Sequence, residues 1–133
     1  EGAKIIRSTN QSISHSWYTD IEFESVVFDR GNLFDTRDKT KLTVPSDGIY
    51  LAIATCVFAP SSAGHGEVSF TINGSRDSLS SIISPDFSEY RSTKVVLLEI
   101  YNLNQGDFIG VSAVRSLSGS DITRSSLTLI RVG

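Results

Sequence analysis

The sequence predicts an all-β fold, and three observations lead to that prediction. Val, Ile and Thr, whose branched Cβ atoms favour strands, make up about a quarter of the 133 residues. Turn signals such as Asn73-Gly74 recur along the chain and separate runs of strand length. No segment keeps the hydrophobic period of an amphipathic helix. Together these features favour a β-sandwich or a β-barrel.

Nine segments are expected to form strands, because each is an apolar or alternating run bounded by turn residues. Asn73-Gly74 tolerates positive φ at both positions, so we expect it to close a two-residue hairpin. Asp29 and Asp35 are expected to accept hydrogen bonds from the amides of their turns. In chain order the expected strands are 3–8, 21–28, 41–44, 48–58, 66–73, 78–84, 92–102, 107–115 and 124–132.

Length and composition predict a single globular domain over residues 1–133. Apolar residues make up 39% of the chain and charged residues 20%, which separates it from disordered and collagen-like sequences. The one cysteine, Cys56, excludes an internal disulfide and a thiolate zinc site. Stability is therefore expected to come from core burial or from association.

The charge pattern argues against two classes of partner. Lys and Arg number 12 against 15 Asp and Glu, and no run of cations suits a phosphate backbone, so we expect no nucleic acid partner. No apolar stretch reaches the roughly 20 residues that a membrane-spanning helix needs, so we expect no membrane insertion.

Two segments, 48–58 and 94–101, lack the alternation that one solvated face would give a strand. In the first, Tyr50, Ala52, Ala54, Cys56 and Phe58 alternate with five other residues, of which only Thr55 is polar. Either another part of the same chain covers the second face, or a second subunit does. We favour the second subunit, because an exposed apolar patch of this size would promote aggregation.

Several short motifs also occur in a fixed order. The run Phe28-Asp29-Arg30-Gly31-Asn32-Leu33-Phe34-Asp35 is followed by Leu42-Thr43-Val44-Pro45-Ser46-Asp47-Gly48-Ile49-Tyr50. Val68–Gly74, Leu103–Ile109 and Ser126–Val132 follow in turn. In this order and spacing the chain resembles the globular-head family of complement C1q, which is related to the tumour necrosis factor fold.

The resemblance implies a jelly-roll sandwich of about ten antiparallel strands that assembles as a homotrimer around a hydrophobic axis. It also implies a stalk or fibre at the N-terminal side. Leu51-Ala52-Ile53 and Leu127–Ile130 stand where many family members carry aromatic residues, and in this the chain is more similar to C1q-like domains of bacteria and of bacteriophage virions. The residues expected at the trimer interface are Tyr50, Ala52, Ala54, Cys56, Phe58, Val95, Leu97 and Tyr101.

The expected function is that of a non-catalytic head which trimerises a stalk or fibre and displays loops to a partner. The partner would be a cell-surface receptor, a glycan or a capsid protein, and the setting extracellular or on a virion surface, in a fibre, a decoration protein or a bacterial surface protein. Multivalent display would replace strong affinity at a single site. Plain solvated connections are the alternative for the expected ligand-binding loop residues, which are Ser61, His65, Arg115, Ser118 and Asp121.

Catalytic and metal-binding patterns are weak. The chain has no Gly-x-Ser-x-Gly nucleophile turn, and its two histidines, His15 and His65, lie in Ser- and Gly-rich stretches. No spacing singles out a catalytic pair of carboxylates. We therefore predict no enzyme, no metal site and no cofactor. Calcium is the one ion that the turns at 35–38 and 118–121 would accept, although neither matches a calcium loop.

A monomeric jelly-roll module that binds carbohydrate is the alternative function. Such modules stack sugars on several exposed aromatic rings, whereas this chain has a single tryptophan, Trp17. Tyr18 beside it would point to the opposite face of a strand.

Overall fold

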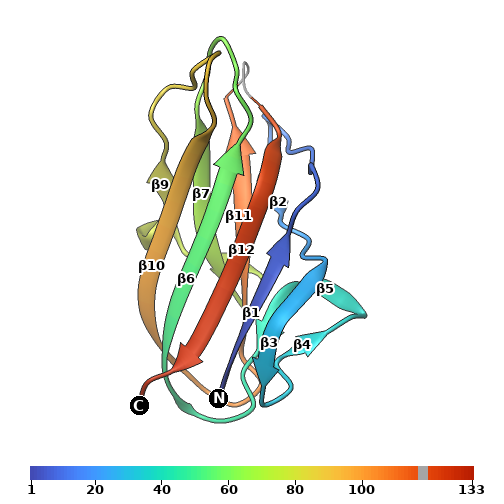
Figure 1. Ribbon diagram of the computed structural model, residues 1–133. Helices are drawn as coiled ribbons and strands as arrows, with labels where there is room; N and C mark the ends of the chain where they lie inside the picture. Colours follow the sequence, from blue (N-terminus) through green and yellow to red (C-terminus); the bar gives the residue numbers. More distant parts are fainter. Residues whose placement is uncertain (117–119) are drawn as a thin grey trace.

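Two antiparallel β-sheets packed face to face make up the computed structural model, which describes residues 1–116 and 120–133 (Figure 1). The front sheet of Figure 1 has the strand order β10-β6-β12-β1-β3. The back sheet has the order β4-β5-β11-β7-β8, and in addition β2 pairs with β11 and β9 with β7. The all-β sandwich predicted from the sequence is confirmed. The strands are β1 Gly2–Arg7, β2 Thr19–Asp20, β3 Ser25–Arg30, β4 Phe34–Asp35, β5 Asp38–Thr43, β6 Gly48–Phe58, β7 Gly66–Ile72, β8 Ser75–Arg76, β9 Ile82–Ile83, β10 Thr93–Leu103, β11 Phe108–Arg115 and β12 Ile122–Arg131.

Most of the expected strands form close to their expected bounds. The segment 48–58 is β6, residue for residue, and 92–102 becomes β10 with a shift of one residue. The expected strand 21–28 begins only at Ser25, because residues 21–24 connect the two sheets. The expected strand 78–84 is wrong over its first half, where a short 3₁₀ helix, Ser78–Ser80, precedes β9. Asp77 caps this helix by accepting a hydrogen bond from the amide of Leu79.

Strand β6 is the centre of the front sheet, with β10 on one side and β12 on the other. Its even-numbered side chains point to the back sheet and are fully buried. In the two neighbouring strands, Leu97 and Leu127 both pair with Ala54 and are buried with it. The small alanine thus lies between two large leucines, and the core fills at native density in this row.

The back sheet supplies the other half of the core through the alternate residues of β7 and β11. Val68 pairs with Ala113 and Phe70 with Val111, and all four are buried. The ring of Tyr101 meets the ring of Phe70 edge to face, with centroids 5.9 Å apart. These contacts join the two sheets into one hydrophobic core.

The expected turn chemistry is confirmed at all three places, including Asp35, whose carboxylate accepts a hydrogen bond from the amide of Arg37 over 2.9 Å. Asn73 and Gly74 both have positive φ, 52° and 84°, and connect β7 to β8. The carboxylate of Asp29 accepts hydrogen bonds from the amides of Leu33 and Phe34, at 2.8 and 2.9 Å. These interactions fix the course of the chain between strands.

Both termini lie at the same end of the sandwich, at the bottom of Figure 1. The amide of Arg131 donates to the carbonyl of Glu1 over 2.9 Å, so the two ends of the chain are in contact. The loops that precede β7, β10 and β12 are at the opposite end, at the top of Figure 1. We call these the distal loops, meaning residues 59–65, 84–92 and the described part of 116–121.

Candidate interaction surfaces

The outward face of the front sheet is apolar and open to solvent. On β10, Val96, Leu98 and Ile100 have exposed fractions of 47, 60 and 61%. By register they flank Thr55, Ile53 and Leu51 of β6, which are half-buried on the same face. Within the described residues, no segment of the chain covers the three β10 side chains. We call this surface the front apolar face, and it comprises Ile49, Leu51, Ile53, Val96, Leu98, Ile100 and Ile130.

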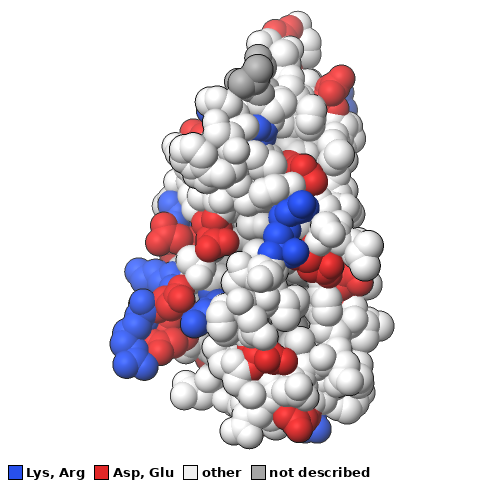
Figure 2. All heavy atoms as spheres, turned by 180° about the vertical axis from the view of Figure 1, so that it is seen from behind, with Lys and Arg blue, Asp and Glu red and all other residues white. Residues whose placement is uncertain are grey.

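The outward face of the back sheet differs, because it is polar and partly covered by the chain itself. Ser69 of β7 and Ser112 of β11 lie side by side, with hydroxyl oxygens 3.3 Å apart, and both are buried. Nearby, the ring of Tyr18 is covered by the guanidinium of Arg76, 4.3 Å from the ring centroid. Figure 2 shows the charged groups of both signs that lie on this side of the molecule.

Seven of the eight residues predicted for the trimer interface belong to the core of the single chain. Tyr50, Ala52, Ala54, Cys56 and Phe58 have no exposed area in the single chain, and Val95 and Leu97 have 3 and 1%. Tyr101 is half-buried, and its hydroxyl donates to Asp77 over 2.5 Å. The seven buried side chains face the back sheet, so they cannot contact another subunit without opening the sandwich. The unpartnered face of the same strands is the front apolar face.

The predicted ligand-binding residues lie at the distal end, except Ser118, which is outside the described residues. The amide of His65 donates to Ser116 Oγ over 3.0 Å, and the Ser116 amide donates to the His65 carbonyl over 2.9 Å. Arg115 Nε donates to the carbonyl of Ile13 over 3.0 Å. The loop before β7 and the turn after β11 are therefore held together.

Ser61 and Asp121 extend the same end of the molecule. The Ser61 amide donates to the Ser88 carbonyl over 2.8 Å, and the Asp121 carbonyl accepts from the Ala59 amide over 3.0 Å. The rings of Phe58 and Phe87 pack 5.1 Å apart beneath these loops. The distal loops are thus connected by hydrogen bonds, with His65 half-buried among them. Their exposed side chains include charged residues and Tyr90, which is 85% exposed.

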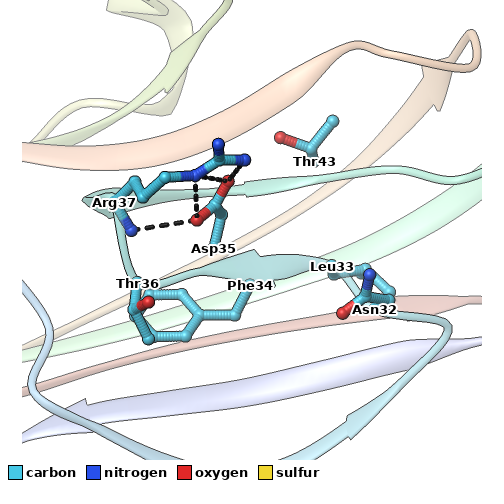
Figure 3. A pocket seen from close by; sticks show the side chains of 7 residues that line it. All are labelled: Asn32, Leu33, Phe34, Asp35, Thr36, Arg37 and Thr43. Atoms are coloured by element: carbon cyan, nitrogen blue, oxygen red, sulfur yellow. Dashed lines mark hydrogen bonds and ion pairs between the residues drawn. The ribbon is translucent and has the colours of Figure 1, made fainter.

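A small open pocket of about 460 Å³ lies beside the β4–β5 hairpin (Figure 3). Asp35 and Arg37 point toward one another there, with Arg37 Nη2 2.8 Å from Asp35 Oδ2. This hydrogen-bonded pair lowers the pKa of Asp35 to about 2. Both charges are already partnered, so the pocket offers neither a free base nor a free cation. Its lining is Asn32, Leu33, Phe34, Asp35, Thr36, Arg37 and Thr43.

The remaining chemical groups weighed in the sequence are in ordinary environments. Burial raises the pKa of the Cys56 thiol to about 12, which keeps it protonated at neutral pH. Among the described residues, no group of three or more His, Cys, Asp or Glu side chains is placed to hold a metal ion. The calcium turn at 35–38 has its Asp35 carboxylate paired with Arg37, and part of the turn at 118–121 is outside the described residues. No helix in the described part of the chain is long and apolar enough to cross a membrane.

The aromatic platform of a carbohydrate module has little support in this arrangement. Trp17 is 68% exposed, but the neighbouring Tyr18 ring is occupied by Arg76. Partial burial and, after it, hydrogen bonding to Glu67 raise the pKa of the Tyr18 hydroxyl. This leaves a single free ring at this place rather than the several that sugar stacking uses.

Comparison of the structure with solved structures decides the fold type. The globular domain of zebrafish complement 1qA superimposes with a TM-score of 0.71 over 99% of this chain and 97% of that one, at 13% identity. Murine APRIL, in a crystal structure at pH 5.0, gives a TM-score of 0.63 over 99% of this chain and 100% of that one, at 18% identity. The fold is that of the C1q and tumour necrosis factor jelly rolls. No protein-family model and no curated protein sequence matches the chain.

Both faces of β6 are apolar, as the sequence predicts, but the face predicted to meet another subunit is the core face. Small side chains on one face suggested close approach of subunits, whereas their role is to make room for leucines within the chain. The sequence of β12 indicates which face of β6 is the core face, since Leu127 and Leu129 alternate with Ser126 and Thr128. Once β12 is placed beside β6, its apolar side and the alanines of β6 share the core face.

Proposed function

We propose that this protein is a non-catalytic, extracellular head module that assembles as a homotrimer through the front apolar face and presents its distal loops to a binding partner. The observation that carries the proposal is the exposure of Val96, Leu98 and Ile100, on a strand that already supplies Val95, Leu97 and Leu103 to the core from its other face. Burying each of these half-exposed side chains would contribute roughly 1 kcal/mol to association.

Two further observations support this proposal. The jelly roll of the C1q and tumour necrosis factor type implies a trimer around a hydrophobic axis, and the front sheet contains the two strands, β6 and β10, with apolar residues on both faces. The termini and the distal loops lie at opposite ends, so a stalk joined at the N-terminus would leave the loops free. Three copies side by side would then present three loop sets in one direction.

The partner is proposed as a cell-surface receptor, a glycan or a capsid protein. A virion fibre, a virion decoration protein or a bacterial surface protein is the setting that the sequence resemblance implies. The two solved structures named above, from zebrafish and mouse, add no support for that setting. The described part of the distal loops exposes serines, charged side chains and the ring of Tyr90, which suits recognition of a polar surface.

The test is the mass in solution, measured by light scattering on a sizing column, of the parent and of Leu98→Glu. We expect three chains for the parent and one for the variant, because a carboxylate at the centre of the front apolar face would lose its water on assembly. Circular dichroism should show the same β content for both, since Leu98 lies outside the core.

Leu79→Glu is the matched control, because Leu79 is 93% exposed and belongs to the 3₁₀ helix beside the back sheet. It makes the same chemical change away from the front apolar face and should leave the mass at three chains. A parent mass of one chain would refute the trimer, and equal masses for Leu98→Glu and the parent trimer would refute this interface.

A further inference from the structure

A hollow of about 300 Å³ on the outward side of the front sheet is lined by cations from distant parts of the sequence. Lys4 and Arg7 come from β1, Lys94 from β10 and Arg124 from β12. No Asp or Glu is among the residues that line it. Because these cations are scattered along the chain, the sequence shows no basic run, and only the sheet brings them together. We call this the cationic hollow.

The strand register explains how two of the cations converge. Lys94 and Arg124 both lie opposite Val57 of β6, one on each side, and both project outward. Their Cα atoms are therefore two strand spacings apart, about 10 Å. Side chains of this length reach toward a common group placed between them, above Val57.

Arg7 lines the edge of the hollow, but its guanidinium is held by backbone carbonyls of residues that do not line it. Its guanidinium donates to the carbonyls of Thr9, Asn10 and Glu22 over 2.9 to 3.2 Å. These acceptors are neutral, so they orient the side chain without cancelling its charge. The nearest carboxylate, that of Glu24, accepts from Thr9 and Ser8, and its pKa is lowered mainly by those bonds and only in smaller part by Arg7.

The other three cations have no carboxylate of their own. The ion pairs in the described part of the chain involve Arg37, Lys41, Arg76 and Arg131, and none includes Lys4, Lys94 or Arg124. Hydroxyl groups complete the lining. Thr55 Oγ1 and Ser126 Oγ are 2.6 Å apart, so one of their two protons makes this bond and the other is available to an acceptor.

We propose that the cationic hollow binds a tetrahedral oxyanion, phosphate or sulfate, either as the free ion or as the terminal group of a small ligand. Lysine and arginine supply charge, arginine supplies paired N–H donors, and the Thr55–Ser126 pair supplies a hydroxyl donor. The hollow continues the front apolar face, so in the proposed trimer it would lie beside the subunit contact. The effect of the anion on assembly rests on the proposed function. Without an anion, the three hollows of a trimer would repel one another, so a bound oxyanion would stabilise the trimer.

The experiment titrates the full chain with sodium sulfate, with inorganic phosphate and with glucose 6-phosphate, at constant ionic strength in chloride, and measures heat. We expect saturable binding that weakens at least tenfold in Lys94→Gln/Arg124→Gln, because each lost charged hydrogen bond costs about tenfold in affinity. The control Arg37→Gln/Lys39→Gln removes the same two charges from the β4–β5 hairpin and should bind like the parent.

The relative affinities identify the source of the anion. Tighter binding of glucose 6-phosphate assigns the site to the terminal group of a ligand, and tighter binding of inorganic phosphate or sulfate assigns it to the free ion. Absence of saturable binding, or equal weakening in the control variant, overturns the proposal. Saturable binding of heparin alone would also overturn it, since the surface would then recognise an extended polyanion.

Light scattering on the same samples separates this inference from the proposed trimer. An anion that binds through Lys94 and Arg124 to a protein of single-chain mass would retain the site and refute the trimer. A trimer that binds no anion would refute the site alone. If both hold, sulfate should lower the concentration at which the trimer dissociates, and the Lys94→Gln/Arg124→Gln variant should lose that effect.

Discussion

The outward faces of the two sheets have opposite character, although both belong to strands of one small sandwich. The back sheet has polar residues, Ser69 and Ser112, on its outward face and buries them within the chain. The front sheet has Val96, Leu98 and Ile100 on its outward face and leaves them exposed. A monomer is expected to do the reverse. The exposed apolar face therefore favours an interaction with another molecule, because the same chain covers a more polar face.

Ala54→Arg, on the core side of the front sheet, is expected to have the largest effect on the free energy of unfolding. Ala54 has no exposed area and pairs with Leu97 and Leu127, so an arginine there would both overfill the core and bury a charge. We expect a loss of about 3–5 kcal/mol in the free energy of unfolding, enough to abolish folding of a small domain. Denaturant unfolding followed by tryptophan fluorescence measures it.

Ala63→Arg is the control for this change, because Ala63 is exposed in a distal loop. It should unfold at the same denaturant concentration as the parent. Should Ala54→Arg remain folded and only change the mass in solution, then Ala54 would lie at a subunit contact after all.

Some features of the fold could be predicted from the sequence, and others, such as the core position of Ala54, could not. The fold class, the full extent of β6 and the Asn73-Gly74 turn were predictable, because alternation and turn chemistry are local properties. Which face of β6 is the core depends on its neighbours, β10 and β12, which lie far along the chain. The short strands β2, β4 and β8 have two residues each and carry no pattern of their own. The cationic hollow could not be predicted for the same reason, since its residues come from four strands, β1, β6, β10 and β12.

An aspartate introduced on either outward face is expected to have an intermediate effect on the free energy of unfolding. Ser112→Asp would bury a charge beside Ser69 and should cost about 2–4 kcal/mol in the free energy of unfolding. Ser126→Asp would place the carboxylate beside the cationic hollow, where Lys94 and Arg124 are without an acidic partner, and should cost less than about 1 kcal/mol. Thermal unfolding of the two variants in parallel makes the comparison. Similar losses in both would show that the two outward faces are equally enclosed.

The smallest effect concerns Tyr101, which joins the sheets through its ring and through its hydrogen bond to Asp77. Tyr101→Phe should cost about 1 kcal/mol at neutral pH, because one hydrogen bond is lost. Burial, followed by hydrogen bonding to Asp77, raises the pKa of Tyr101 above its ordinary value of 10.0. Its stabilising contribution is therefore complete below pH 10 and falls as the pH rises above that value, where the unfolded chain ionises first.

The measurement is the midpoint of urea unfolding between pH 7 and pH 11. The difference between parent and Tyr101→Phe should narrow above pH 10. Tyr90 is 85% exposed, and its pKa is raised mainly by a hydrogen bond to Glu89, so Tyr90→Phe should stay much closer to the parent. Cys56 adds a similar decline in all three proteins, because burial raises its pKa from 9.0 to about 12. A difference that stays constant up to pH 11 would show that the Tyr101 phenol is not held by the fold.

The rate at which the buried thiol of Cys56 can be modified reports on opening of the sandwich. Cys56 is the one cysteine of the chain, it lies between Val95 and Ser125 at the centre of the front sheet, and it reacts only as a thiolate. A thiol reagent can therefore reach it only when the two sheets part, so the rate of modification under native conditions counts how often the sandwich opens. Comparing that rate in dilute and concentrated protein would show how far association slows the opening, without any substitution.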